Sequence, residues 1–472
     1  MHKVRRFWIA LAATSILIMN PGIAEAKPVD SAFVSSTSVT VANLTDTNLR
    51  ESSAYLLRNG NTLVSWLEEF EDTTWLKTRV VSPSNTLGPT VTVNQDSPAF
   101  PGTGVNLLPH ISSNEKGDLF ATWVTQATTE SEINQTILGA TSSDGQTWTV
   151  PFTVVPTRIF VLDSVCEDFY SMGDCGYFNI YSAINEQKQL TVATATYQSE
   201  GKSKLSVTSS KTGSSWTELT RIGGFSSDSD VDLTGLSKGF IIGYATSSRG
   251  QTEASSVYMS HLSDAGSSWS KVQRASFKTA NTSFHIKWVE RNSKLASLVI
   301  ASEINAGGLA VRNFDLANVR WTGLSELWQP VPNRFVFQKI SATTYGSSLA
   351  VQYSTYDQKN GATSLLTAVQ SAIGGKVNIK TLENGRDQID PLFTGTSSGS
   401  IPFFAYQFSA GTHVTVLANN TARVMRIPLA TGTYVGSMVI DKQDNLRAAV
   451  WEGDGGIYSV SLVQGKLKIP KN

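Results

Sequence analysis

A short strand-like pattern recurs eight times along the chain. Each copy follows a turn and alternates apolar with small or polar residues over about six positions, the period expected of a β-strand. The copies lie 45 to 71 residues apart, about 55 on average. Their first apolar residues are Leu63, Leu119, Leu190, Phe240, Leu295, Leu349, Ile401 and Leu446.

A repeat of this length, rich in strands and turns, is typical of β-propeller blades. Each blade is a four-stranded antiparallel sheet that must stack on its neighbours to bury both faces. The sequence therefore predicts an all-β propeller of eight blades, or of seven if the first and last segments share one blade. Closure would join a strand at Ser38–Val41 to the C-terminal sheet that ends near Ile469.

Repeat two shows how the four strands of one blade would be arranged. We expect an inner strand at Leu107–Ser112, a second at Asp118–Thr125, a third at Ile133–Thr141 and an outer strand at Trp148–Val155. Repeats three and four follow the same plan.

Three polar turns that end on a tryptophan lie between the third and outer strands of repeats two to four. The first is Thr141–Trp148, and weaker copies occupy Ser209–Trp216 and Asp264–Trp269. Asp and Ser side chains accept hydrogen bonds from nearby N–H groups, and Gly supplies a positive φ. We interpret these turns as structural hairpin locks that perform no chemistry. Their marker residues are Asp144, Gly145, Trp148, Gly213, Trp216, Asp264, Gly266 and Trp269.

The first turn resembles the Asp-box of sialidase-like β-propellers, Ser-x-Asp-x-Gly-x-Thr-Trp. Thr141, Gly145, Thr147 and Trp148 fit that box, whereas Ser143 takes the Asp position and Asp144 follows it. The resemblance implies a propeller whose boxes lie away from the catalytic face.

The same resemblance implies three arginines that hold a carboxylated sugar, a Tyr–Glu nucleophile and an acid/base Asp. The family's first arginine lies in Phe-Arg-Ile-Pro, before the first box. Here Met425-Arg426-Ile427-Pro428 follows every box, and Arg58 and Arg79 lack the motif. No catalytic residue is therefore assigned by the resemblance.

The longest interval between repeats contains both cysteines of the chain. Cys166 and Cys175 are close in sequence, and an even pair in an exported protein indicates a disulfide. We therefore expect a disulfide-stapled insertion at about 156–178 within one propeller domain that spans 27–472.

The first 26 residues have the features of a secretory signal peptide. A basic stretch with Lys3, Arg5 and Arg6 precedes an apolar run, and Ala24-Glu25-Ala26 fits a cleavage site. An uncleaved N-terminal anchor is the alternative. We expect a secreted, extracytoplasmic protein that has no membrane span after cleavage.

Charge and motif content exclude several classes of function. The whole chain has 38 basic and 38 acidic residues, and the part after residue 26 keeps 35 and 37, a net charge of −2. That balance offers no basic surface for nucleic acid. The five histidines lack metal-ligand spacing and no phosphate loop occurs, so we expect no metal and no cofactor. We also expect a monomer.

Candidate ligand-binding residues are those at the starts of the inner strands, which would face the central funnel. Asp228, Asp230 and Asp232 also have the spacing of a calcium loop, but Leu233 stands where that loop needs Gly. An acidic stretch from Glu68 to Trp75 is the other candidate, and a solvated hairpin tip explains it equally well. The funnel candidates are His110, Asp230, Asp232, His285, Lys287, Arg334, Arg386, Asp387 and Asp390.

Two functions are compatible with this pattern. The first is a non-catalytic extracellular scaffold that binds glycans or cell-surface proteins. The second is a divergent glycoside hydrolase, similar to an exo-sialidase, with its active site in the funnel. Arginines converging with an acid would favour the enzyme, whereas scattered Ser, Thr and single charges would favour the scaffold.

Overall fold

The structure of the protein is a computed structural model with 33 β-strands as its regular elements. It describes residues 31–468 with gaps at 46–47, 71–72, 100–106, 162–175, 199–201, 226–229, 247–253, 276–278, 281–283, 303–308, 329–333, 346–347, 358, 360, 371–372, 374, 376, 386–389, 397–400, 409–410, 419–420, 428, 430–432 and 455–456. No helix among these residues is long and apolar enough to cross a membrane.

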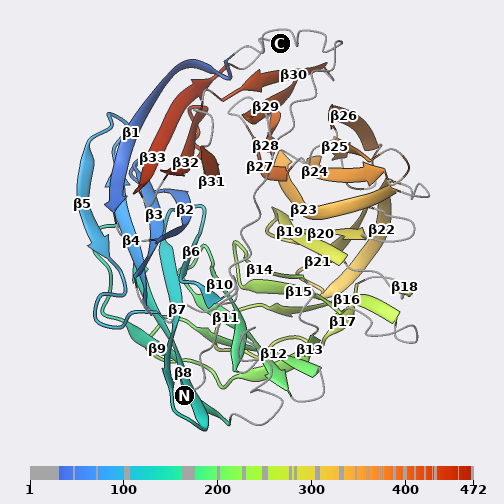
Figure 1. Ribbon diagram of the computed structural model, residues 1–472. Helices are drawn as coiled ribbons and strands as arrows, with labels where there is room; N and C mark the ends of the chain where they lie inside the picture. Colours follow the sequence, from blue (N-terminus) through green and yellow to red (C-terminus); the bar gives the residue numbers. More distant parts are fainter. Residues whose placement is uncertain are drawn as a thin grey trace, which may run out of the picture.

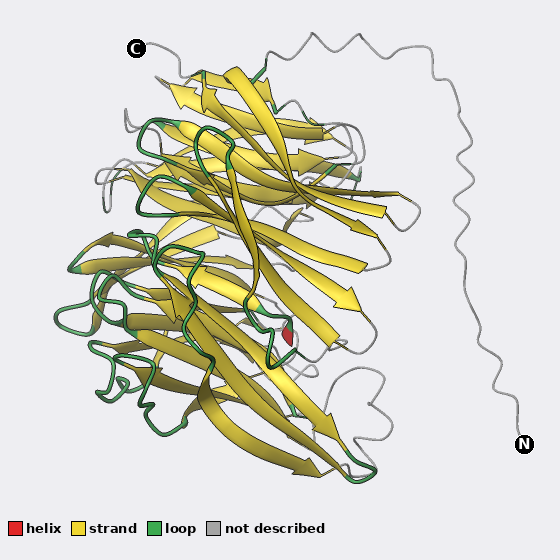
Figure 2. Ribbon diagram, turned by 90° about the vertical axis from the view of Figure 1, so that its left-hand side faces the viewer, coloured by secondary structure: helices red, strands yellow, loops and turns green. Residues whose placement is uncertain are grey.

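The strands form eight antiparallel sheets arranged as blades around a central axis (Figure 1). The expected eight-bladed propeller is confirmed, and the seven-bladed alternative is wrong. Seen from the side, the blades form a disc, and their strands run obliquely to its axis (Figure 2).

The strands of each blade succeed one another from the axis to the rim. Blade 1 comprises β2 (Asn48–Leu56), β3 (Thr62–Phe70), β4 (Thr73–Val81) and β5 (Leu87–Thr92); blade 2, β6 (His110–Ser113), β7 (Leu119–Thr128), β8 (Glu132–Ser142) and β9 (Phe152–Val161); blade 3, β10 (Tyr177–Ile184), β11 (Leu190–Gln198), β12 (Lys202–Ser210) and β13 (Thr220–Phe225); and blade 4, β14 (Val231–Gly235), β15 (Phe240–Thr246), β16 (Ala254–Leu262) and β17 (Gln273–Arg274), with β18 (Thr279–Ala280) also on β16. Blade 5 comprises β19 (Phe284–Asn292), β20 (Leu295–Ser302), β21 (Leu309–Asp315) and β22 (Arg320–Trp328); blade 6, β23 (Arg334–Tyr345), β24 (Ser348–Asp357), β25 (Ala362–Gln370) and β26 (Val377–Gly385); blade 7, β27 (Asp390–Thr396), β28 (Pro402–Phe408), β29 (Gly411–Ala418) and β30 (Thr421–Arg426); and blade 8, β31 (Tyr434–Ile440), β32 (Asn445–Asp454), β33 (Ile457–Leu467) and β1 (Phe33–Thr45).

The eight repeated segments of the sequence are the second strands of the eight blades. These strands are buried on both faces because each lies between two neighbouring blades. In β7, Leu119, Ala121 and Trp123 pack into the cluster shared with blade 1, whereas Phe120 and Val124 pack toward blade 3. The core of the protein is thus a series of apolar layers between adjacent blades.

The last blade takes its outer strand from the beginning of the chain. β1 pairs antiparallel with β33, from Phe33 opposite Leu467 to Thr45 opposite Ile457. The predicted closure at Ser38–Val41 is confirmed. β1 covers the edge of β33 that would otherwise be unpaired.

Three predicted boundaries need correction. The inner strand of blade 2 begins at His110 rather than Leu107, because Leu107 lies in a short turn and packs toward blade 3. The outer strand of blade 2 begins at Phe152 rather than Trp148. This is because Trp148 packs into the interface with blade 1 and the Thr149 N–H donates to the Thr141 carbonyl. The expected insertion at about 156–178 overlaps the ends of β9 and β10. The remainder of it, with Cys166 and Cys175, lies outside the described residues, as does the expected signal segment.

A glycine at the seam between blades 8 and 1 provides a test of ring closure. A Cβ added to Gly436 would lie 1.8 Å from the Ser52 carbonyl oxygen, so we expect Gly436→Ala to lower the free energy of unfolding by about 3 kcal/mol or more. Gly60→Ala is the control, since Gly60 has open space and a φ of 81°, and strain there should cost about 1–2 kcal/mol. Denaturant unfolding measures both, and equal losses would contradict the close seam.

Candidate functional site

The eight inner strands surround the central axis of the propeller, and we refer to the region along this axis as the channel. All inner strands run in the same direction, so they begin at one end, which we call the mouth, and turn into the second strands at the other, the hairpin end. Around the axis the inner strands are β2, β6, β10, β14, β19, β23, β27 and β31 (Figure 1).

Four of the predicted funnel residues come together at the mouth, on blades 4 and 5. Asp230 Oδ2 accepts a hydrogen bond from the Ile286 N–H at 2.9 Å and lies 3.8 Å from His285 Nδ1. Asp232 forms an ion pair with Lys287, with 2.9 Å between Oδ1 and Nζ. The charge of Asp232 raises the pKa of Lys287 above its usual value.

The carboxylate of Asp232 also contacts the backbone of the next blade. Its Oδ2 accepts the Trp288 N–H at 2.5 Å. Asp230 and Asp232 thus fasten the free edge of β19 to β14. Because each of them already accepts backbone N–H groups, the calcium-type spacing serves a hydrogen-bonding purpose here. Asp228 lies outside the described residues, and among those described no group of acidic, His or Cys side chains is placed to hold a metal.

The same kind of contact recurs between other neighbouring inner strands. The Ala54 N–H of blade 1 donates to Ser437 Oγ of blade 8 at 2.7 Å. The distance between His110 Nε2 of blade 2 and Ser182 Oγ of blade 3 is 2.8 Å. Burial and then the charge of Asp230 raise the pKa of Tyr181, so blade 3 and blade 4 also meet through polar groups. Polar residues at the inner edge therefore connect one blade to the next.

The other funnel candidates are only partly within the described structure. Arg334 and Asp390 begin β23 and β27, as expected for inner-strand starts, but their side chains are not among those described. Arg386 and Asp387 lie outside the described residues.

Two of the three arginines considered for sialidase chemistry lie on the outer half of their blades, whereas Arg58 lies in the turn between β2 and β3. Arg426 ends the outer strand β30, where its carbonyl accepts the Ala32 N–H. Arg79 lies on the third strand β4 and donates to the carbonyls of Val41 and Gly88. Neither guanidinium is positioned at the mouth, which agrees with assigning them no catalytic role.

The hairpin end of the channel holds a cavity of about 630 Å³, which we call the chamber. Five inner strands and the turns that follow them line it, from blades 2 to 6. Eight of the 22 lining residues carry a hydroxyl group: Ser112, Ser113, Ser182, Thr234, Ser237, Ser293, Thr343 and Thr344.

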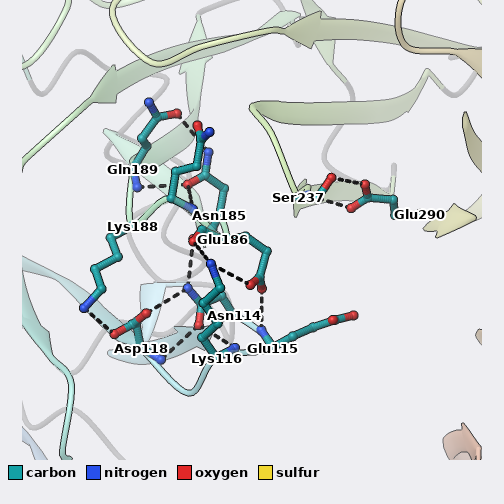
Figure 3. A network of polar contacts seen from close by, with 11 residues as sticks. Asn114, Glu115, Lys116, Asp118, Asn185, Glu186, Lys188, Gln189, Ser237 and Glu290 are labelled. Carbon is teal, nitrogen blue, oxygen red and sulfur yellow. Dashed lines mark hydrogen bonds and ion pairs between the residues drawn. The ribbon is translucent and has the colours of Figure 1, made fainter. Parts of the chain in front are cut away.

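Three glutamates from different blades also face the chamber. Partial loss of solvent and then the charges of Glu186 and Glu290 raise the pKa of Glu115. The Glu290 carboxylate accepts both the N–H and the hydroxyl of Ser237, at 2.6 and 2.5 Å. In Figure 3, the Glu115 side chain extends away from the Glu186 contact, toward the side where Ser237 and Glu290 lie.

The turns at this end form a polar network that the sequence analysis does not predict. Asn114, Asn185 and Asp441 each accept N–H groups two and four residues ahead, at 2.9–3.0 Å. Adjacent turns are joined in turn, since Asn114 Nδ2 donates to the Asn185 carbonyl and Glu115 N–H to Glu186 Oε1 (Figure 3). A sequence pattern could have identified these turns. In each of them, Asn or Asp stands four residues before a second polar residue, and that second residue directly precedes or begins the repeated strand.

The tryptophan-ending turns also contact the preceding blade. Ser142 Oγ accepts the Gly145 N–H at 2.8 Å, and Asp144 Oδ1 accepts the Thr147 N–H at 2.7 Å. A Cβ on Gly145 would lie 2.7 Å from Leu63 Cδ1 of blade 1.

The next two copies of this turn follow the same pattern. Gly213 and Gly266 both have a positive φ. The Trp216 ring lies 6.2 Å from the ring of Phe152 in blade 2. Trp269 packs toward blade 3, and Asp264 pairs with Lys211 of that blade at 2.9 Å. That these turns bind no ligand stays a prediction.

The acidic stretch near Trp75 is partly internally paired. Glu68 accepts the Trp66 Nε1–H at 2.7 Å and lies 3.8 Å from Lys77 Nζ. Glu69 pairs with Arg50 at 2.5 Å, and residues 71–72 lie outside the described residues.

Comparisons with known proteins find similarity in fold. No protein-family model matches the chain, and no curated protein sequence matches it. The polysaccharide lyase Uly1 is 9% identical with a TM-score of 0.47, over 78% of this chain and 91% of that one. A PL25 ulvan lyase bound to -[GlcA(1-4)Rha3S]- is 10% identical with a TM-score of 0.43, over 83% and 100%. The NanB sialidase of Streptococcus pneumoniae is 12% identical with a TM-score of 0.38, over 93% and 71%. At these identities the likeness concerns the fold alone.

The pKa of His110 provides a test of the inner-edge contacts. Burial lowers it from 6.5 to about 4, so the unfolded chain takes up this proton first as the pH falls. His110 therefore does not change the free energy of unfolding above pH 6.5. Between pH 6.5 and pH 4 it should lower that free energy, by at most about 3 kcal/mol. We expect His110→Gln to flatten that part of the curve of unfolding free energy against pH.

His261 has a similarly lowered pKa of about 4, so some slope should remain in the His110→Gln variant. Ser112→Ala, which keeps both histidines, is the control and should retain the full wild-type slope. A His110→Gln curve that parallels the wild type would show that His110 is not held neutral in the folded protein.

Proposed function

We propose that the protein is an extracytoplasmic, non-catalytic scaffold that binds a glycan without net charge in the chamber. The observation that carries the proposal is the hydroxyl-rich lining of a cavity of about 630 Å³ on the propeller axis. That volume lies within the range of small-molecule sites, about 300–1,000 Å³.

The lining suits the polar groups of a sugar. Ser and Thr hydroxyls each donate one hydrogen bond and accept others, so they can match sugar hydroxyls in either sense. Ser112, Ser182 and Thr234 lie on three successive inner strands, which are held in place by the turn network. Each of the three hydroxyls already makes a hydrogen bond within the protein, to the Phe120 carbonyl, His110 or Asp232, so their orientation is set and they would meet a ligand mainly as acceptors.

The charge of the chamber favours a neutral ligand over an acidic one. Glu115, Glu186 and Glu290 all line it, and each would repel a sugar carboxylate. Arg291 is the one arginine among the lining residues that the structure describes. A sialic acid bound through three arginines would therefore find few partners in the described part of the chamber.

Two of the three chamber carboxylates, Glu186 and Glu290, are engaged in ways that do not favour acid/base catalysis, whereas Glu115 has a raised pKa and accepts none of these bonds. Both oxygens of Glu290 accept hydrogen bonds from Ser237, and Glu186 accepts the Glu115 N–H at 2.8 Å. A general acid needs a protonated carboxyl within reach of the leaving group. These contacts support binding in preference to glycoside hydrolysis.

A chamber-filling variant tests the proposal. Ser113 is exposed and lines the chamber, so Ser113→Trp should occupy the cavity without disturbing the core. On a glycan array with neutral and sialylated members, we expect wild type to bind neutral glycans and Ser113→Trp to bind them at least about tenfold more weakly, a loss of about 1.4 kcal/mol.

The control is Ser84→Trp, which places the same side chain on an exposed turn of blade 1 and should bind as wild type. Turnover of a fluorogenic sialoside, abolished by Arg334→Ala or Asp390→Asn, would instead establish the glycoside hydrolase.

A further inference from the structure

An exposed pair of stacked aromatic rings lies at the mouth of the channel, on blade 8. Tyr434, the first residue of β31, is directly opposite Trp451 of β32. Their ring centroids are 4.6 Å apart with 22° between the planes, and 53% of Tyr434 remains exposed. Exposing this much of a stacked ring forgoes burial that would otherwise stabilise the fold.

The base of this pair is rigid. Trp451 and Tyr458 both pack against the apolar cluster between blades 8 and 1. Tyr458 also lies close over Gly453, where an added Cβ would be 2.3 Å from its ring. Tyr434 therefore rests on a fixed support, and a ligand that stacks there would not have to order the ring first.

Polar groups of blade 1 lie at the same level. The Ala54 N–H donates to Ser437 Oγ, and both inner strands run in the same direction. Tyr434 precedes Ser437 by three residues and therefore lies nearer the mouth. Counting back equally from Ala54 along β2 places it level with about residues 50–51. On the face of β3 toward blade 8, Glu68 follows Trp66 and accepts the Trp66 Nε1–H.

The size of the exposed surface indicates the kind of ligand. An aromatic side chain offers about 150–250 Å², so half of Tyr434 with part of Trp451 gives on the order of 100–200 Å². A stable protein interface needs about 800 Å² on each partner. The two rings alone fall well short of that area, and they suit the apolar C–H face of one sugar ring.

We propose that Tyr434 and Trp451 form a stacking subsite for one pyranose ring. The inference rests on the proposed function, since it gives the glycan a second contact at the opposite end of the channel from the chamber. The subsite does not depend on sugar charge, because ring stacking acts on the C–H face.

Calorimetric titration with cellohexaose, mannohexaose, xylohexaose and maltohexaose tests this subsite. For any hexaose that wild type binds, we expect Tyr434→Ala to weaken binding roughly three- to tenfold, the loss expected for one stacked ring. Tyr434→Phe keeps the ring and should bind as wild type. Phe70→Ala is the matched control, since Phe70 is 50% exposed on the neighbouring blade and should not affect binding.

The outcomes separate the two proposals. If Tyr434→Ala binds as wild type while Ser113→Trp loses binding, the chamber stands and the stacking subsite is wrong. If Tyr434→Ala loses binding while Ser113→Trp does not, the subsite stands and the chamber is not the binding site. If wild type binds none of the four hexaoses and no glycan on the array, both proposals fail. Thermal unfolding of each variant confirms that the fold is intact.

Discussion

The pairing of β1 with β33 is the interaction on which the rest of the structure depends. Every other sheet is made of strands that follow one another in the chain, so it can form locally as a meander. This pairing joins the two ends of the chain and completes blade 8, which lies beside blade 1. The channel, its mouth and its chamber exist because the ring is closed, and closure also removes sheet edges that could pair with other chains.

A second constraint acts at the inner edge of each blade. The inner strand has a partner on one side only, so its free N–H groups need other acceptors. Asp230, Asp232 and Ser437 supply those acceptors to the next blade. Charged residues near the axis therefore have a structural task before any ligand arrives, and so do several of the chamber hydroxyls, such as Ser182 and Ser237.

The features that can be predicted from the sequence are local and periodic. The alternation that begins at Leu119 and its seven equivalents predicts the second strands, since each must be apolar on both faces. Ser38–Val41 is identifiable as the closing strand because a free edge needs a partner. The grouping of Asp230 with His285 is not predictable, because it depends on which side chain of one blade meets which backbone group of the next, some 55 residues away.

Other features escape prediction or are placed wrongly for related reasons. The sequence pattern places Trp148 at the start of a strand, yet its ring lies in the interface with the preceding blade and the strand starts four residues later. The turns at Asn114, Asn185 and Asp441 carry a common pattern, but the residues that complete them are Gly117, Lys188 and Asp444, and only the structure shows that all three have a positive φ.

The way the ring closes also bears on how the chain is made. β1 leaves the ribosome before any other strand of the propeller, and its partner β33 is the last to be synthesised. Throughout translation β1 lacks its sheet partner, although it can already pack against blade 1 through Val41 and Leu44. Seven complete blades can form before β33 is made. The pairing that closes the ring is therefore the last sheet pairing that can form.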